Sequence, residues 1–237
     1  MKHTAKLGLI ISSVLLATTQ GVAETDAAPK TGADLMPIYK YLHANPELSL
    51  KEKNSSALLA KELEALGFEV KTGLGDAWIK EKALKEQGVV RDGVGGFGVA
   101  GVFRNGDGPT VMIRADMDAL AMPELTGLPY ASRNPGRMHA CGHDGHTVML
   151  LGAAQELARE GGFNGTVHFI FQPAEEGRGG AARMVADGFF ERFPVDRVYG
   201  LHNMPGLDPD EIAVVEGPQL ASSDRWEVSF TGEGTHG

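Results

Sequence analysis

The spacing of apolar residues predicts two amphipathic helices near the start of the chain. We expect them over residues 34–44 and 51–66, where apolar positions recur every three or four residues and therefore share one face. Gly67 then marks the end of the second helix. A short strand at 68–71 and a helix of mixed charge at 76–87 are expected to follow.

Strands and helices alternate regularly from residue 110 onward. The pattern predicts strands at 110–115, 166–172 and 197–201, separated by helices over 145–160 and 179–190. Such alternation is typical of right-handed βαβ crossovers. We therefore expect an α/β fold with a mainly parallel sheet flanked by helices.

A glycine-rich loop at 93–98 has the G-x-G-x-x-G spacing of dinucleotide-binding turns. That fingerprint needs a strand before it and a helix after it, whereas here a charged stretch precedes it and a β-branched run at 99–103 follows. The turn sequence at 105–108 then predicts a hairpin into the next strand. A nicotinamide-dependent reductase is therefore disfavoured.

The overall composition is that of a soluble globular protein. The 237 residues are 42% hydrophobic and 22% charged, and 22 basic against 31 acidic side chains give a net charge of −9. This charge argues against binding to nucleic acid or to anionic membranes. The single cysteine, Cys141, excludes an internal disulfide.

Residues 1–23 have the features of an export signal. Lys2 and Lys6 precede a short apolar stretch at 7–17, and small residues follow at 21–23. The apolar stretch is shorter than the roughly 20 residues needed to span a bilayer. We expect this segment to be removed, leaving a periplasmic or secreted protein that does not bind membranes.

Metal-binding residue types follow three of the predicted strands and precede one helix. In open α/β sheets, ligands bind beyond the carboxyl ends of the strands. Thiolate, imidazole and carboxylate groups together suit Zn, Mn, Co or Ni better than Ca or Mg. The candidate residues are Asp116, Asp118, His139, Cys141, His143, His146, Glu175, Glu176 and His202.

Some of these residues also have ordinary structural interpretations. His139 and His146 are explained equally well as metal ligands and as residues that pack nearby or support a ligand, and Asp118 is also explained as a helix cap. Cys141 lies among histidine, glycine and aspartate, which favours a metal ligand over a buried apolar thiol.

The adjacent glutamates Glu175 and Glu176 cannot both point the same way. One can bind a metal while the other takes a proton from water and returns it to a leaving amine, as a general base and then a general acid. The alternative is a solvated acidic turn.

Five motifs follow one another along the chain: Arg114–Leu120, Thr126–Tyr130, His139–His146, Phe171–Gly177 and Gly200–His202. In this order they resemble the M20 metallopeptidase family. Within it, they are most similar to the amidohydrolase branch of hippurate hydrolases, N-acyl-amino-acid deacylases and auxin-conjugate hydrolases. The resemblance runs from about residue 34 to residue 237.

This resemblance implies a zinc-peptidase-like catalytic domain with two divalent metal ions. By this analogy Cys141 bridges the ions, and His143, Glu176 and His202 are further ligands. Glu175 would be the catalytic base, and Asp116 a carboxylate that orients a ligand.

The resemblance also implies an inserted α+β lid and dimerisation domain. A strand pattern at 226–230 runs into the segment 232–237, which resembles the start of that lid. His236 would help to hold the scissile carbonyl, often from the partner subunit of a homodimer. The expected organisation is a signal peptide at 1–23, a catalytic domain at 24–220 and the start of the lid at 221–237.

Two departures from the family pattern accompany this interpretation. The stretch 74–95 is longer than the family's usual turn, and the family continues past residue 237 to a last ligand histidine. The resemblance therefore predicts a C-terminally truncated chain.

The sequence predicts a metal-dependent amidohydrolase that cleaves N-acyl amino acids or similar small conjugates. A dipeptidase or aminoacylase of the same superfamily is one alternative. A metal-binding fragment without turnover is another.

Overall fold

The structure, a computed structural model, describes most of the chain. The predicted export signal and His236 lie outside the described residues. The described residues are 34–87, 94–208, 210–218, 226 and 228–234.

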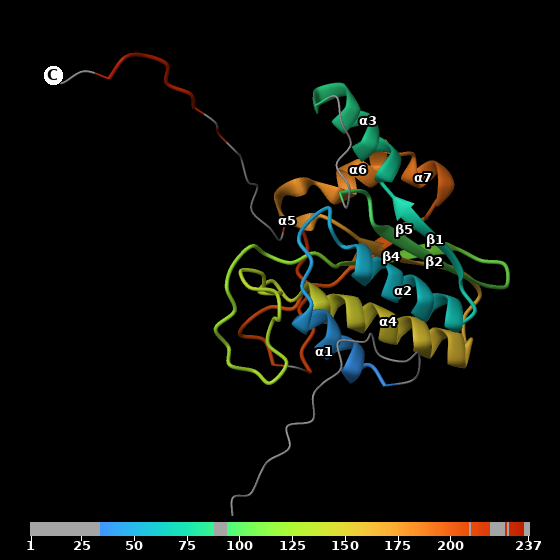
Figure 1. The fold of residues 1–237 in the computed structure, drawn as a ribbon. Helices are drawn as coiled ribbons and strands as arrows, with labels where there is room; N and C mark the ends of the chain where they lie inside the picture. Colours follow the sequence, from blue (N-terminus) through green and yellow to red (C-terminus); the bar gives the residue numbers. More distant parts are fainter. Residues whose placement is uncertain (1–33, 88–93, 209, 219–225, 227, 235–237) are drawn as a thin grey trace, which may run out of the picture.

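The described part of the chain contains both helices and strands, interspersed along the sequence (Figure 1). The helices are α1 (Met36–Ala44), α2 (Lys53–Ala65), α3 (Asp76–Gln87), α4 (His143–Glu160), α5 (Glu175–Arg178), α6 (Gly180–Ala186) and α7 (Phe189–Arg192). The strands are β1 (Glu69–Leu74), β2 (Gly98–Asn105), β3 (Thr110–Asp116), β4 (Gly165–Gln172) and β5 (Arg197–Gly200). The α/β class predicted from the alternating pattern is confirmed.

A five-stranded sheet in the order β1-β2-β4-β3-β5 forms the centre of the fold. β3 pairs in parallel with β4 and β5, whereas β2 runs antiparallel to both β1 and β4. The expectation of a mainly parallel sheet is therefore wrong, because the sheet is mixed. The parallel half is the half that matters for the site, since it brings the carboxyl ends of β3, β4 and β5 to one edge.

The predicted hairpin between β2 and β3 is also wrong, because β4 lies between these strands. Phe169 of β4 is opposite Gly101 on one side and Ile113 on the other. The turn reverses the chain as expected but leaves space for one strand. β4 enters this space at Gly165 (φ 134°), where an added Cβ would lie 2.3 Å from the carbonyl oxygen of Pro109. The nearly complete burial of β4 favours its central position.

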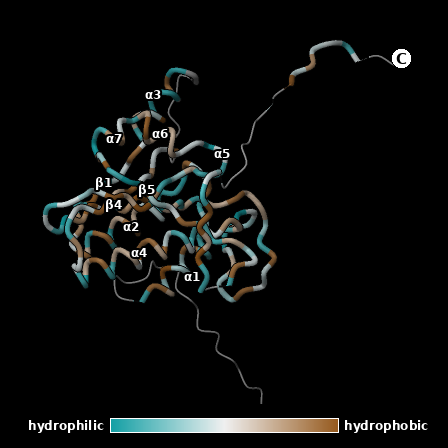
Figure 2. Tube along the Cα trace, turned by 180° about the vertical axis from the view of Figure 1, so that it is seen from behind, coloured by the Kyte–Doolittle hydropathy of each residue, from teal (hydrophilic) through white to brown (hydrophobic). Residues whose placement is uncertain are grey.

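Helices cover both faces of the sheet (Figure 1). α1, α2 and α4 pack on one face, where the main core contains Phe169 and Phe171. α6 and α7 cover the other face, where Ile170 packs with Met184 and Phe189. Successive residues of β4 thus point into different cores, as strand geometry requires. Hydrophobic residues line the strands between the two helical layers (Figure 2).

Three local features differ from the sequence prediction. The helix expected over 179–190 is broken into α6 and α7 at Gly188, which has a φ of 73°. The short helix α5 follows β4 without a helical pattern in the sequence. No strand forms among the described residues 226 and 228–234.

Two other observations bear on the sequence interpretation. β2 begins at Gly98, so a strand follows the glycine-rich loop, as predicted. Among the residues that the structure describes, no helix is both long and apolar enough to cross a membrane.

Candidate metal centre

The predicted ligands converge at the edge of the sheet where β3, β4 and β5 end. Three groups of potential ligand atoms, each within 4.8 Å of one another, share His143 as their common member. Cys141 and His202 form one group with it, Asp116 and His146 a second, and Glu175 and Glu176 a third.

His143 is held so that one ring nitrogen is free to bind a cation. Its side chain is buried, and Nδ1 lies 2.8 Å from the carbonyl oxygen of Asp118. A carbonyl oxygen only accepts hydrogen bonds, so the proton of the neutral ring is on Nδ1 and Nε2 then keeps its lone pair. Nε2 lies 3.8 Å from Glu176 Oε1 and 3.9 Å from Glu175 Oε2.

Cys141 and His202 face each other at the outer side of this cluster. The Cys141 Sγ atom is 3.4 Å from His202 Nε2, and His202 Nδ1 donates to the carbonyl of Asn203 at 2.6 Å. Burial, together with the negative charges of Glu176 and Glu175, raises the pKa of the Cys141 thiol to about 11. A divalent cation would reverse this effect, because it stabilises the thiolate.

The residues present fit a divalent metal centre. His143 Nε2 and Glu176 Oε1 are buried and have no hydrogen-bond partner within the described part of the chain. Leaving such groups unsatisfied costs about 1–3 kcal/mol each. These two unsatisfied atoms lie 3.8 Å apart, beside a thiol and a second imidazole, and divalent cations held by these groups would satisfy both.

Asp116 lies at the side of this cluster, between Arg114 and His146. Its carboxylate is 2.8 Å from Arg114 Nη1 and 2.6 Å from His146 Nδ1. Burial opposes ionisation of Asp116, but the His146 hydrogen bond and the Arg114 charge outweigh it and lower the pKa to about 2. Asp116 is therefore a fixed negative charge, 3.7 Å from His143 Nε2.

Both ring nitrogens of His146 have close polar neighbours. Nδ1 lies 2.6 Å from Asp116 Oδ1, and Nε2 lies 2.6 Å from Asn203 Oδ1 and 3.0 Å from the backbone nitrogen of Asn203. With both nitrogens engaged, His146 joins Asp116 to the segment that carries His202. His139, the other histidine with an open interpretation, is buried, and burial lowers its pKa to about 4.

The two adjacent glutamates are separated by their exposure. The side chain of Glu175 is 44% exposed and that of Glu176 is 22% exposed. Their backbone N–H groups donate to the two carboxylate oxygens of Asp118 at 2.9 and 3.0 Å. Asp118 therefore holds this turn, a role that neither the ligand nor the helix-cap interpretation of the sequence anticipates.

A buried histidine of α1 links this helix to the site, and the sequence analysis did not predict it. His43 Nδ1 lies 2.7 Å from Asp144 Oδ2, and its Nε2 lies 3.1 Å from Glu124 Oε1. Asp144 directly follows His143 in α4. The contacts join residues 81 and 101 positions apart, so no local motif could have revealed them.

We expect the contribution of His43 to stability to fall as the pH rises. The hydrogen bond to Asp144 is the main cause of its raised pKa, and Glu124 adds to it against burial. A histidine with a raised folded-state pKa stabilises the fold fully below its unfolded pKa of about 6.5, and this contribution is lost above the folded value. The free energies of unfolding of metal-free wild type and metal-free His43→Gln, measured in urea, should therefore differ most at low pH.

His168 of β4 provides a control of opposite sign. Burial lowers its pKa, so the stability difference between wild type and His168→Gln should increase as the pH rises through the region of the unfolded pKa. A difference in unfolding free energy between wild type and His43→Gln that stays constant with pH would contradict a raised pKa of His43 in the folded state.

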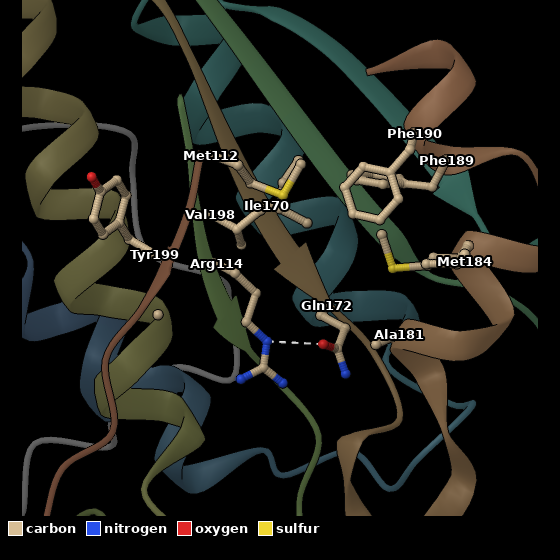
Figure 3. A pocket seen from close by; sticks show the side chains of 12 residues that line it. Met112, Arg114, Ile170, Gln172, Ala181, Met184, Phe189, Phe190, Val198 and Tyr199 are labelled. Atoms are coloured by element: carbon tan, nitrogen blue, oxygen red, sulfur yellow. Dashed lines mark hydrogen bonds between the residues drawn. The ribbon is translucent and has the colours of Figure 1, made fainter. Parts of the chain in front are cut away.

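An apolar hollow lies on the other face of the sheet, between α6, α7 and β5 (Figure 3). Its lining includes Met184, Phe189, Phe190 and Val198, and Arg114 and Gln172 stand at one end, joined by a hydrogen bond of 2.8 Å. Since Arg114 also contacts Asp116, it is shared by this hollow and the ligand cluster.

The fold and the cluster together define a metal-binding type of α/β domain, with its ligands at the carboxyl edge of the parallel strands. The model of Peptidase family M20/M25/M40 matches residues 112–235, more than half of the chain. The chain belongs to this family, as the sequence motifs indicated.

Curated relatives and solved structures agree with this assignment. The chain is 42% identical over 197 residues to the hippurate hydrolase of Campylobacter jejuni, covering 83% of this chain and 46% of the relative. It is 40% identical over 203 residues to the N-acetyl-L-cysteine deacetylase of Bacillus subtilis, covering 85% of this chain and 44% of the relative.

A crystal structure of the Bacillus subtilis YXEP protein, described as a dinuclear metal-binding peptidase of the M20 family, matches with a TM-score of 0.61 and 36% identity. This match covers 73% of the present chain and 43% of that chain. The chain thus spans less than half the length of each of these three proteins.

Proposed function

We propose that this chain supplies the metal-binding catalytic part of an amidohydrolase that cleaves N-acyl amino acids or similar small conjugates. The observation that carries the proposal is the convergence of Cys141, His143, Glu176 and His202 around unsatisfied ligand atoms, with Glu175 at their edge. Support for the substrate class comes from two relatives, whose names specify hippurate and N-acetyl-L-cysteine. Both compounds are N-acyl amino acids.

In this proposal Cys141, His143, Glu176 and His202 would hold two divalent ions (Mn, Zn, Co or Ni), and Cys141 would be the ligand common to both. When bound, the ions supply Lewis acidity toward the amide carbonyl and toward water. Asp118 orients the His143 ring through its backbone carbonyl, and Asp116 adds a fixed negative charge beside it.

Glu175 is the residue we assign to proton transfer. Its carboxylate is the more exposed of the pair and lies 3.9 Å from His143 Nε2, next to the space where an amide would react. From there it takes a proton from the attacking water and returns it to the nitrogen of the leaving amine.

The direct test is hydrolysis by the complete reading frame that contains this chain. We expect N-acetyl- and N-benzoyl-amino acids to be cleaved with added Mn²⁺ or Zn²⁺, and activity to disappear after dialysis against a chelator. Dipeptides belong in the same assay, because the YXEP protein is described as a peptidase. Absence of any metal-dependent amide cleavage would refute the proposal. If the 237-residue chain binds two metal equivalents without cleaving any amide, the alternative of a metal-binding fragment without turnover would be favoured.

Export and dimerisation are part of the same proposal. Residues 1–23 would direct the protein to the periplasm or the medium, and His236 would contribute to the site of a partner subunit. Mass spectrometry of the exported protein should find an N-terminus near residue 24, and an intact first residue would refute export. A monomeric active enzyme would refute the role of His236 across subunits.

A further inference from the structure

The glutamate turn of the candidate site begins with a backbone conformation that side chains disfavour. Within the described residues, the non-glycine residues with positive φ are Leu50, at 68°, and Ala174, at 56°. Ala174 immediately precedes Glu175. Such conformations persist only where surrounding contacts enforce them, and they gather at functional sites.

The same side-chain oxygen contacts both of these residues. Glu52 Oε1 accepts hydrogen bonds from the Leu50 N–H at 3.0 Å and from the Ala174 N–H at 2.8 Å. Glu52 is completely buried, and it precedes α2. Its contact with Ala174 joins residues 122 positions apart.

Other contacts fix the rest of the turn. The carbonyl of Ala174 accepts from the Gly180 N–H at 2.8 Å, and the next two N–H groups bind Asp118. An added Cβ at Gly180 would lie 1.7 Å from the carbonyl oxygen of Pro173, so the backbone there is closely packed. In the described part of the chain, the N–H of Ala174 donates to Glu52 Oε1.

We infer that Glu52 is a positioning residue: it holds Ala174 in its left-handed conformation and thereby sets where Glu175 and Glu176 stand relative to His143. The role in catalysis rests on the proposed function, whereas the contact with the turn does not. Burial raises the pKa of Glu52 to about 8, so at neutral pH Oε1 acts mainly as the carbonyl acceptor of a neutral acid. Glutamine keeps such an acceptor, and methionine has a similar size without it.

The test compares Glu52→Gln and Glu52→Met, each with and without Ala174→Gly. Glu62→Gln, a change at a buried glutamate within α2, is the matched control. The first readout is amide hydrogen exchange at residues 174–176 in metal-free protein. The second is titration with Co²⁺, followed by the absorbance that a Cys141 thiolate ligand gives.

We expect Glu52→Met to expose the Ala174 N–H to exchange and to weaken Co²⁺ binding by about 10- to 100-fold, as loss of a partner behind a ligand usually does. Glu52→Gln and Glu62→Gln should stay close to wild type. Ala174→Gly should restore much of the Co²⁺ affinity to Glu52→Met, because glycine adopts a positive φ without support.

The inference would be overturned if Glu52→Met bound Co²⁺ as tightly as wild type and protected the Ala174 N–H from exchange as well as wild type. It would also be overturned if adding Ala174→Gly to Glu52→Met restored none of the lost Co²⁺ affinity. If Glu52→Met does not fold, free exchange of the Ala174 N–H in wild type, or loss of Co²⁺ affinity in Glu52→Gln, would overturn it. If wild type binds no Co²⁺, the proposed metal centre fails, and the exchange data still decide whether Glu52 holds the turn.

Discussion

Replacing Glu175 with glutamine is expected to lower kcat for amide hydrolysis by about 10²- to 10⁴-fold, the usual contribution of a general acid–base group. Glutamine keeps the size of the side chain and its contacts but cannot accept a proton. Because the side chain is 44% exposed, the fold should be unaffected. The measurement is steady-state hydrolysis of an N-acyl amino acid by the complete enzyme, at equal metal content.

Glu176→Gln is the informative comparison, because it should lose metal as well as activity. Glu176 Oε1 is buried and unsatisfied, and it faces His143 Nε2. Thus Glu175→Gln should be inactive with its metal retained, and Glu176→Gln inactive with its metal depleted. Glu175→Gln activity equal to wild type would eliminate Glu175 as the base.

The second large effect is expected for Cys141→Ala, which should reduce metal affinity by more than the roughly 10- to 100-fold typical of partners behind a ligand. The thiolate is assigned to both ions, so its removal weakens both at once. Serine at this position should also bind poorly, because a hydroxyl is much harder to deprotonate than a thiol.

Thermal unfolding with and without metal provides the measurement for Cys141→Ala. Ligand at 100 times its Kd stabilises a fold by about 2.7 kcal/mol, and the wild-type chain should show this gain while the variant should lose most of it. The metal-free proteins should unfold at similar temperatures, since Cys141 is only partly buried. An unchanged metal-dependent gain in the variant would remove Cys141 from the ligand set.

The sequence predicts which side chains converge where the residue types are uncommon and locally spaced. Cys141 and His143 are two residues apart, Glu175 and Glu176 follow a clear strand, and the structure brings both pairs together. The class of fold follows from the same regular alternation. These features depend on short-range patterns, which one sequence contains.

The contacts that three residues make across the fold were not predicted. Asp118 was expected only as a ligand or a helix cap, and Glu52 and His43 are ordinary polar residues in their local segments. Their contacts with Glu175, with Ala174, and with Asp144 and Glu124, respectively, span between 57 and 122 positions. The prediction of where β4 lies in the sheet fails for the same reason. A turn sequence specifies that the chain reverses, but it contains no information on which strand will pair with either arm.

The insertion of β4 between β2 and β3 has a consequence for folding during synthesis. Until residue 172 has been made, the facing edges of β2 and β3 have no partner, because the strand that fills the gap follows α4. Unpaired strand edges associate readily with other chains, and pairings distant in sequence form slowly. The order in which the chain emerges therefore leaves a gap in the middle of the sheet until β4 is made, and two unpaired edges face this gap in the nascent chain.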